Sequence, residues 1–272
     1  MSLWIRIDGV QSDPQRATVA VRDRAFQYGD GLFETMRLEG GAIRYRQDHL
    51  ERLARGCDRL GIALPNAAAL ARDLDDAATE CRDGVVKLIV SRGDGERGYR
   101  PERSAVPRRV VTVYDAAAAP TGVPIVARWC ATRLARNPCL AGIKHLNRLE
   151  QVLAQAEWQD PRIAEGLMLD VEGEVICGTC SNVFAVVGGT LCTPDLRFAG
   201  VAGVMRRRVL AAADERGVAV AEISMRPADI ESASELFVTN ALTGIRPIGQ
   251  LGDRYWTGAP IATQLAHDLG LW

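Results

Sequence analysis

The alternation of apolar and polar positions predicts strands through the first part of the chain. Such runs fall at 3–8, 18–21, 84–93 and 110–114. Between the second and third runs, apolar residues recur at helical spacing. This mixture of strands and helices is typical of an α+β domain.

Two helices are predicted in this part of the chain, the second over 67–81. Asp48 can cap the first, and Arg52 falls among its charged positions, on the face that is usually solvated. The buried stripe of the first helix is expected to consist of Leu50, Leu53, Ala54, Cys57 and Leu60.

Strand-like segments dominate the second half. They fall at 166–170, 174–176, 182–187, 190–193 and 235–244, and the last enters a polar turn. Between the last two, Gly203 precedes a helix expected to end at Gly217. A helix that opens on glycine leaves backbone N–H groups free, and such groups commonly bind phosphate.

The length and composition of the chain indicate how it is divided into domains. A chain of 272 residues with 47% hydrophobic content is long enough for two domains. The alanine-rich segment 116–122 ends in Pro120 and Gly122, which is typical of a linker. We therefore expect a smaller α+β domain at 1–115 and a larger one at 123–272.

Charge and cysteine content exclude several classes of protein. Basic and acidic residues nearly cancel, at 33 and 34, so nucleic-acid binding is not favoured. No apolar run approaches ~18 residues and the N-terminus lacks a signal-peptide core, so we expect a cytoplasmic protein without a membrane partner. The seven cysteines are expected to be reduced thiols, and Cys177-x-x-Cys180 alone is weak support for a metal site, so none is expected.

Lysine is rare here, and its rarity gives the first candidate for catalysis. Only Lys87 and Lys144 occur among the 33 basic residues, and the rest are arginine. Arginine can replace lysine as a cation, but not as a deprotonatable amine. Lys87 alternates within a strand, which favours a structural role. Lys144 is therefore the candidate nucleophile, suited to Schiff-base chemistry with a carbonyl.

The residues after Lys144 predict a helix. Its apolar face would consist of Leu146, Leu149, Leu153 and Ala156, with Asn147 as a possible cap. The positive end of that helix would favour the neutral amine of Lys144. Together with an arginine on a helix face and a glycine-opened helix, this lysine fits an enzyme that uses pyridoxal phosphate.

Four motifs carry a more specific resemblance. They lie at 26–35 (FQYGDGLFET), 137–151 (NPCLAGIKHLNRLEQ), 203–206 (GVMR) and 240–245 (NALTGI). The chain resembles the fold-type IV pyridoxal phosphate enzymes over nearly its whole length. The resemblance implies a two-domain α+β fold like that of D-amino-acid aminotransferases. It also implies a homodimer with its active site between the two domains.

Within that group, segments 142–148 and 91–99 are more similar to aminodeoxychorismate lyases than to aminotransferases of branched-chain or D-amino acids. Such lyases convert 4-amino-4-deoxychorismate to 4-aminobenzoate and pyruvate in folate synthesis. The resemblance implies that Lys144 binds the cofactor covalently and later moves the substrate proton.

The resemblance also implies roles for other residues. Arg52 would bind the cofactor phosphate, which overrules its assignment to a solvated face. Arg97 and Tyr99 would bind a substrate carboxylate, in related aminotransferases often across the dimer interface. The remaining cofactor-binding positions are Cys177, Gly203, Val204, Met205, Asn240 and Ala241.

Cys177 departs from the family pattern. Family members usually carry a glutamate five residues before the position of Asn182, and that carboxylate pairs with the pyridine nitrogen. Here the position is Cys177. Glu174 lies three residues earlier, and an odd shift along a strand places a side chain on the other face, so Glu174 is not expected to substitute.

Two alternatives remain open. The first is an aminotransferase for branched-chain or D-amino acids, which would need a second, keto-acid substrate. The second is an arginine-rich binding protein without enzymatic activity, which would not be yellow and would not change absorbance on borohydride treatment.

Overall fold

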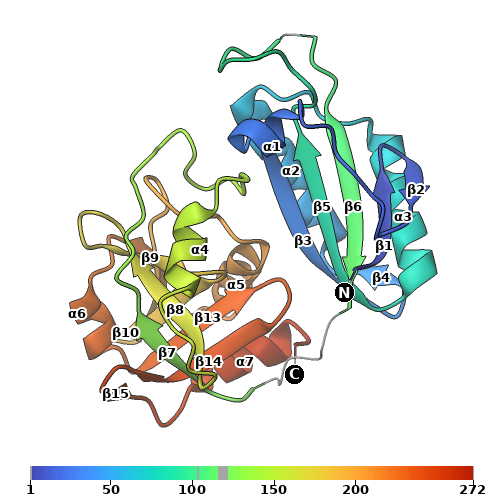
Figure 1. The fold of residues 1–272 in the computed structure, drawn as a ribbon. Helices are drawn as coiled ribbons and strands as arrows, with labels where there is room; N and C mark the ends of the chain where they lie inside the picture. The colour runs from blue at the N-terminus through green and yellow to red at the C-terminus, as the bar shows by residue number, and fades with distance from the viewer. Residues whose placement is uncertain (1, 103, 116–121, 272) are drawn as a thin grey trace. The chain divides into compact units, whose positions relative to one another are not determined.

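The chain folds into two units, each built on its own β-sheet (Figure 1). This computed structural model describes residues 2–102, 104–115 and 122–271. The first unit comprises Met1–Ala118 and Ile143–Asn147, and the second comprises Ala119–Gly142 and Arg148–Trp272. The segment that carries Lys144 thus groups with the first unit. Residues 116–121 of the expected linker lie outside the described residues.

The first unit contains a six-stranded antiparallel sheet in the order β2-β1-β6-β5-β3-β4. Its strands are β1 (Ser2–Ile7), β2 (Val10–Ser12), β3 (Gly31–Glu39), β4 (Ala42–Ile43), β5 (Gly84–Ser91) and β6 (Arg108–Tyr114). Its helices are α1 (Arg24–Tyr28), α2 (Arg46–Leu60) and α3 (Ala67–Cys81). The predicted strand at 18–21 is wrong, because these residues form no strand.

Alternation along β3 separates the two faces of this sheet. Leu32, Met36 and Leu38 are buried on the face where β3 packs against α2. Phe33 and Thr35, at the intervening positions, are only half-buried. The strand begins at Gly31, within the motif at 26–35.

The buried face of α2 differs from the predicted stripe. Leu53 and Cys57 are buried as expected, whereas Leu50 and Leu60 are only half-buried. His49 and Arg52 are buried instead, with Arg52 only 7% exposed. The solvated position that helical spacing assigned to Arg52 is therefore wrong, since β3 supplies a buried carboxylate opposite this face.

The second unit contains a nine-stranded mixed sheet, in which β15 pairs with β14 off the path β12-β11-β10-β13-β14-β7-β8-β9. Its first strands are β7 (Ile125–Trp129), β8 (Ile163–Leu169), β9 (Val175–Gly178), β10 (Asn182–Val187) and β11 (Thr190–Pro194). The others are β12 (Val220–Ile223), β13 (Glu235–Asn240), β14 (Gly244–Leu251) and β15 (Arg254–Tyr255). Its helices are α4 (Leu149–Gln155), α5 (Val204–Glu215), α6 (Pro227–Ser232) and α7 (Pro260–Asp268).

Apolar clusters fill the second unit. Phe184 and Phe237 stack with ring centroids 5.1 Å apart, in a cluster to which α5 and α7 contribute. A second cluster includes Val183 and Trp256. Successive residues of β10, Val183 and Phe184, thus belong to different clusters, as expected for a sheet covered on both faces.

Helix α4 corrects one prediction. Its N-cap is Arg148 rather than Asn147, and the Arg148 side chain makes no capping hydrogen bond. Leu149 and Leu153, assigned to its apolar face, are 69% and 54% exposed. The helix that the sequence predicts after Lys144 therefore begins at Leu149 and does not have the predicted apolar face.

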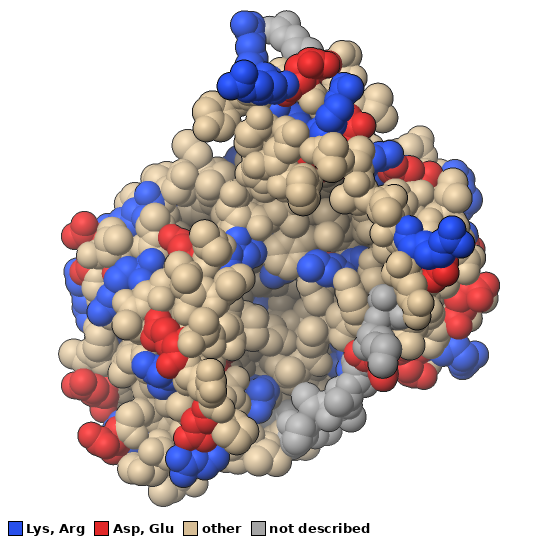
Figure 2. All heavy atoms as spheres, viewed as in Figure 1, with Lys and Arg blue, Asp and Glu red and all other residues tan. Residues whose placement is uncertain are grey.

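Basic and acidic side chains are interspersed on the face shown in Figure 2. Within the described ranges, no helix is both long enough and apolar enough to cross a membrane. The seven cysteines are free thiols.

Candidate active site

Lys144 lies beside strand β3 in the first unit. Its carbonyl accepts a hydrogen bond from Phe33 N at 3.0 Å, and Leu146 N donates to Gly31 O at 3.0 Å. The Lys144 amine lies 4.3 Å from the centroid of the Phe33 ring. Pairing with a strand therefore fixes the backbone of this lysine, and not the helix that follows it.

Two glycines of the motif at 26–35 permit this pairing. A Cβ on Gly31 would lie 2.6 Å from Val90 O and 2.8 Å from the Leu146 side chain. Gly29 ends α1 with a φ of +66°, and a Cβ there would lie 2.7 Å from Asn147 Oδ1. The segment that carries Lys144 makes the close approach that these two glycines permit.

Arg52 belongs to a buried cluster with Glu34 and His49. The Arg52 guanidinium donates to both oxygens of Glu34, from Nε at 2.8 Å and from Nη2 at 2.5 Å. His49 Nδ1 lies 2.6 Å from Glu34 Oε2, and its Nε2 is buried without a hydrogen-bond partner. Burial acts to raise the pKa of Glu34, but hydrogen bonds from Arg52 and His49 and their charges hold it below its usual value.

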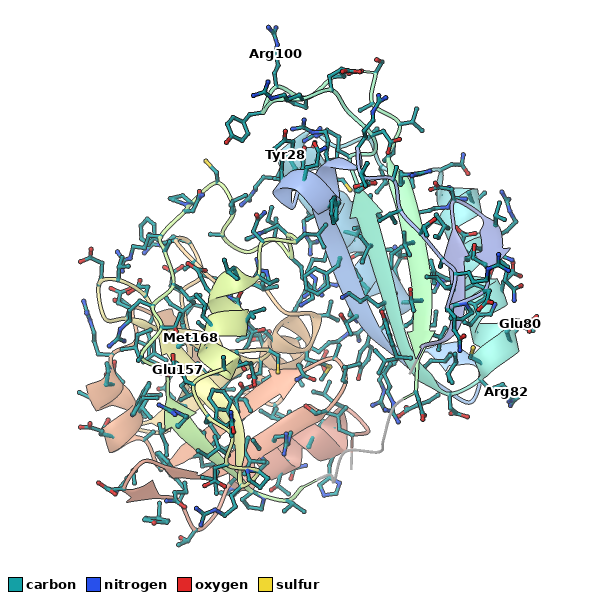
Figure 3. All side chains as sticks on the ribbon, viewed as in Figure 1. Tyr28, Glu80, Arg82, Arg100, Glu157 and Met168 are labelled. Carbon is teal, nitrogen blue, oxygen red and sulfur yellow. The ribbon has the colours of Figure 1, made fainter. Side chains whose placement is uncertain are left out.

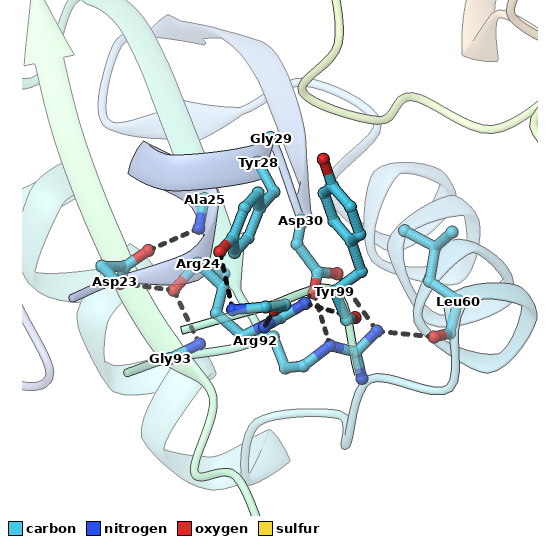
Figure 4. Close-up of polar contacts among 12 residues, drawn as sticks. Asp23, Arg24, Ala25, Tyr28, Gly29, Asp30, Leu60, Arg92, Gly93 and Tyr99 are labelled. Carbon is cyan, nitrogen blue, oxygen red and sulfur yellow. Dashed lines mark hydrogen bonds and ion pairs between the residues drawn. The ribbon is translucent and has the colours of Figure 1, made fainter. Parts of the chain in front are cut away.

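The loop that carries Arg97 and Tyr99 is held by Arg24 of α1 (Figure 4). Arg24 donates to the carbonyls of Gly98 and Tyr99, each at 3.0 Å. The Tyr28 hydroxyl accepts from Gly98 N at 3.1 Å, and the rings of Tyr28 and Tyr99 contact edge to face. The backbone of the loop is thus fixed.

The side chains of this loop remain accessible. Tyr99 is 87% exposed, and Arg100 lies at the outer end of the loop (Figure 3). Arg97 is exposed and lines a hollow of about 470 Å³ together with Arg22 and Tyr28. A fixed backbone with exposed cationic and aromatic side chains can bind an anionic ligand.

Asp30 holds Arg24 in place, together with Arg92. Arg24 Nε donates to Asp30 Oδ2 at 2.8 Å, and Arg92 Nε donates to the same oxygen at 2.7 Å. Burial acts to raise the pKa of Asp30, but these two arginines hold it below its usual value. Sequence reasoning missed Arg24, Asp30 and Arg92, although Asp30 and Arg92 lie in segments that carry the family resemblance.

In the second unit, α5 begins at Gly203, as predicted. Gly203, the N-cap residue, has no side chain that could cap this end of the helix. A Cβ on Gly203 would lie 2.1 Å from Asn182 Oδ1, and Asn182 Nδ2 donates to Val201 O at 2.8 Å. Only glycine therefore fits here, and the first amides of a 12-residue helix, including those of Val204 and Met205, are presented for an anion.

The turn after β13 is closed by Asn240. Its Oδ1 accepts from Leu242 N and Thr243 N, both at 2.9 Å, and from the Thr243 hydroxyl at 3.0 Å. This ring of hydrogen bonds fixes the backbone on both sides of Ala241. The predicted polar turn thus forms at the expected place.

Cys177 is buried on β9, opposite Met168 of β8. Burial raises the pKa of its thiol to about 12, and the charge of Glu165 adds to the shift. The thiol is therefore neutral at any ordinary working pH. Glu174 is engaged elsewhere, with Arg136 at 3.0 Å and with Ser224, which agrees with its exclusion as a substitute.

Glu165 is a buried acid that the sequence did not reveal. Its carboxylate accepts from Thr179 N and Oγ1 and from Ser181 Oγ, at 3.0, 2.5 and 2.6 Å. The Glu165 side chain lies on the face of the β8–β9 hairpin toward Gly178. A Cβ on Gly178 would lie 2.8 Å from Glu165 Cδ. Residues 177 and 178 point to opposite faces, so Glu165 does not replace the missing glutamate on the face of Cys177.

Among residues 2–102, 104–115 and 122–271 there is no group of three or more His, Cys, Asp or Glu that could hold a metal ion. Lys144, Arg52, Arg97 and Tyr99 belong to the first unit. The other predicted cofactor-binding residues belong to the second unit.

Comparison with known proteins identifies the family. Residues 31–251 match the model of amino-transferase class IV. Aminodeoxychorismate lyase of Vibrio harveyi is 37% identical over 237 residues, which cover 85% of this chain and 86% of that protein. A putative branched-chain-amino-acid aminotransferase of Methanocaldococcus jannaschii is 29% identical over 264 residues, covering 92% and 88%.

Solved structures agree with this match. The crystal structure of 4-amino-4-deoxychorismate lyase from Pseudomonas aeruginosa has a TM-score of 0.93 and 44% identity, and covers 97% of each chain. Branched-chain aminotransferase from Thermoproteus uzoniensis, at 23% identity and a TM-score of 0.87 over 98% and 93% of the chains, has the same fold. The predicted fold-type IV architecture is confirmed, and the chain belongs to the class IV aminotransferase family.

Proposed function

We propose that this chain is a pyridoxal-phosphate-dependent lyase that converts 4-amino-4-deoxychorismate to 4-aminobenzoate and pyruvate, as a cytoplasmic homodimer in folate synthesis. Two relatives at 37% and 44% identity bear the name of this lyase. The observation that carries the proposal is Lys144, a rare lysine whose backbone is fixed against β3.

The donor groups fit this cofactor. Lys144 offers a primary amine for an aldehyde, and Arg52 offers a buried guanidinium, a group that forms charge-assisted hydrogen bonds with phosphate. The uncapped start of α5 at Gly203 and the fixed turn around Ala241 present backbone amides of the kind that bind phosphate. This set suits a phosphorylated aldehyde better than a metal or a dinucleotide.

When bound, pyridoxal phosphate supplies an aldehyde for covalent attachment and an electron-accepting ring. Lys144 would hold the cofactor until the ring amine of the substrate takes its place, and its freed amine would then accept the proton from the ring carbon that bears the substrate amine. Breaking of the ring C–O bond would make the ring aromatic and release enolpyruvate, which tautomerises to pyruvate. Arg52 and the α5 amides would hold the phosphate, so that the Lys144 amine and the proton to be removed stay aligned.

An aminotransferase for branched-chain or D-amino acids is the second candidate, because relatives with these names share the family. Cys177 favours the lyase. A carboxylate at this position would stabilise a protonated ring nitrogen, which transamination needs more than elimination does. The neutral, buried thiol lacks that charge.

The test is a product assay on the purified, cofactor-loaded protein with enzymatically made 4-amino-4-deoxychorismate. We expect 4-aminobenzoate and pyruvate to appear in equal amounts, and Lys144→Arg to abolish both. Borohydride should trap the cofactor on the peptide that contains Lys144. Faster transamination of D- or L-amino acids than release of 4-aminobenzoate would refute the lyase assignment.

A further inference from the structure

Both lysines of the chain contact the same aromatic ring. The Lys144 amine lies 4.3 Å from the centroid of Phe33, and the Lys87 amine lies 5.5 Å from it. The distance between the two amine nitrogens is therefore at most the sum of these two distances. The chain has no other lysine. Both copies of its rarest basic residue thus lie beside the Phe33 ring.

Strand pairing places Lys87 on the same face as Phe33. Lys87 of β5 lies opposite Thr35 of β3, and Phe33 lies two residues before Thr35. Residues opposite each other in an antiparallel pair, and residues two apart on one strand, share a face. On its other side Lys87 lies opposite Thr112 of β6. The residues directly opposite Lys87 on both sides are therefore threonines, which carry no charge.

The other charged residues of this face have partners. On β3, Arg37 Nε donates to Glu39 Oε1 at 3.0 Å, and on β6, Arg108 Nε donates to Asp8 Oδ2 at 3.0 Å. For Lys87, the described part of the chain supplies only the Phe33 ring and no carboxylate. A half-buried ammonium without a counter-ion is a ready site for an anion.

We propose that Lys87 binds the ring carboxylate of the substrate, at the end of the ring opposite the amine. The inference rests on the proposed function. In 4-aminobenzoate the carboxylate is para to the amine, one ring diameter away. The Lys87 and Lys144 amines lie 5.5 Å and 4.3 Å from the centroid of one phenyl ring, so a substrate whose amine is at Lys144 can bring a carboxylate at the far end of its ring near Lys87. This proposal differs from the structural role that strand alternation favours for Lys87.

The test compares 4-aminobenzoate with 4-aminobenzamide, its neutral analogue, as ligands of the cofactor-loaded protein in calorimetry. Lys87→Met keeps most of the apolar stem but removes the charge, and Lys87→Arg keeps the charge. We expect Lys87→Met to weaken 4-aminobenzoate binding by about tenfold, as for a lost charge-assisted hydrogen bond, and to leave 4-aminobenzamide unchanged. Lys87→Arg should retain a preference for the carboxylate.

Arg37→Gln is the matched control, since it removes a cation from the same sheet face that already has a partner, Glu39. It should leave the affinity for both ligands unchanged. Equal losses for the acid and the amide in Lys87→Met, or no loss for either, would overturn the inference. The product assay with the wild-type protein tests the lyase function separately, because it can fail while the preference for a carboxylate still depends on Lys87.

Discussion

The guanidinium of Arg52 is held on the carboxylate of Glu34 by two hydrogen bonds, across 18 residues of sequence and with both side chains buried. Nε and Nη2 are engaged, which fixes the plane of the guanidinium and the direction of Nη1. Glu34 is in turn in contact with His49, 2.6 Å from its Nδ1. We therefore regard Glu34 as a positioning residue for Arg52.

Glu34→Gln should destabilise the protein at pH 7 by about 3–5 kcal/mol, because it leaves the buried Arg52 cation without its counter-ion. Arg52 and His49 hold the folded pKa of Glu34 below its unfolded value of about 4.3. A lowered folded pKa means that the stabilisation is complete above that unfolded value and is lost as the pH falls through the folded one. As the pH falls through the folded pKa of Glu34, the difference in unfolding free energy between wild type and variant should therefore decrease.

Urea unfolding at a series of pH values from 7 downwards measures this difference. Asp58→Asn, at an exposed position of the same helix, is the control and should have little effect. A Glu34→Gln variant as stable as wild type at pH 7 would contradict the buried ion pair.

Arg52→Ala should weaken binding of pyridoxal phosphate by about tenfold to a hundredfold, the usual effect of losing charge-assisted hydrogen bonds. Part of the activity should return with excess cofactor, since Lys144 is intact. Fluorescence titration of the cofactor-free protein measures the dissociation constant. Arg55→Ala, exposed on the same helix, should bind the cofactor like wild type. If both variants bind equally well, Arg52 does not hold the phosphate.

Cys177→Glu should raise transamination relative to release of 4-aminobenzoate, because a carboxylate stabilises the protonated ring nitrogen. In the wild type the thiol, whose pKa is raised to about 12, carries no charge at working pH. The ¹⁵N chemical shift of labelled cofactor reports protonation of that nitrogen without turnover. We expect a neutral nitrogen in wild type and in Cys177→Ser, and a protonated one in Cys177→Glu. A protonated nitrogen in wild type would show that another group supplies the charge.

Gly203→Ala should weaken cofactor binding by at least about tenfold, because the added methyl would overlap Asn182 Oδ1 at 2.1 Å and displace the start of α5. The matched control is Gly258→Ala, whose methyl would have Pro260 Cδ at 3.9 Å as its nearest neighbour. Cofactor titration of the two variants distinguishes a lost phosphate site from a general cost of losing glycine. Equal affinities would remove α5 from the cofactor site.

The sequence by itself determined the elements with strong local signals. The strand predicted at 182–187 forms with the same bounds, because a long apolar run between turn residues is a local property. The helix at 67–81 also forms as predicted, with Asn66 as its cap. The scarcity of lysine, a property of composition, singled out Lys144 and Lys87 before any fold was known.

Only the tertiary structure decided which charged residues are buried and which residues they pair with. Helical spacing assigned Arg52 to a solvated face, and a carboxylate from β3 reversed that assignment. The burial of Glu165 and the arginine partners of Asp30 were not evident from the sequence, because these partners lie on other elements. The two lysines are 57 residues apart in sequence. They meet at Phe33 because strand pairing brings distant segments onto one sheet face, which local periodicity does not encode.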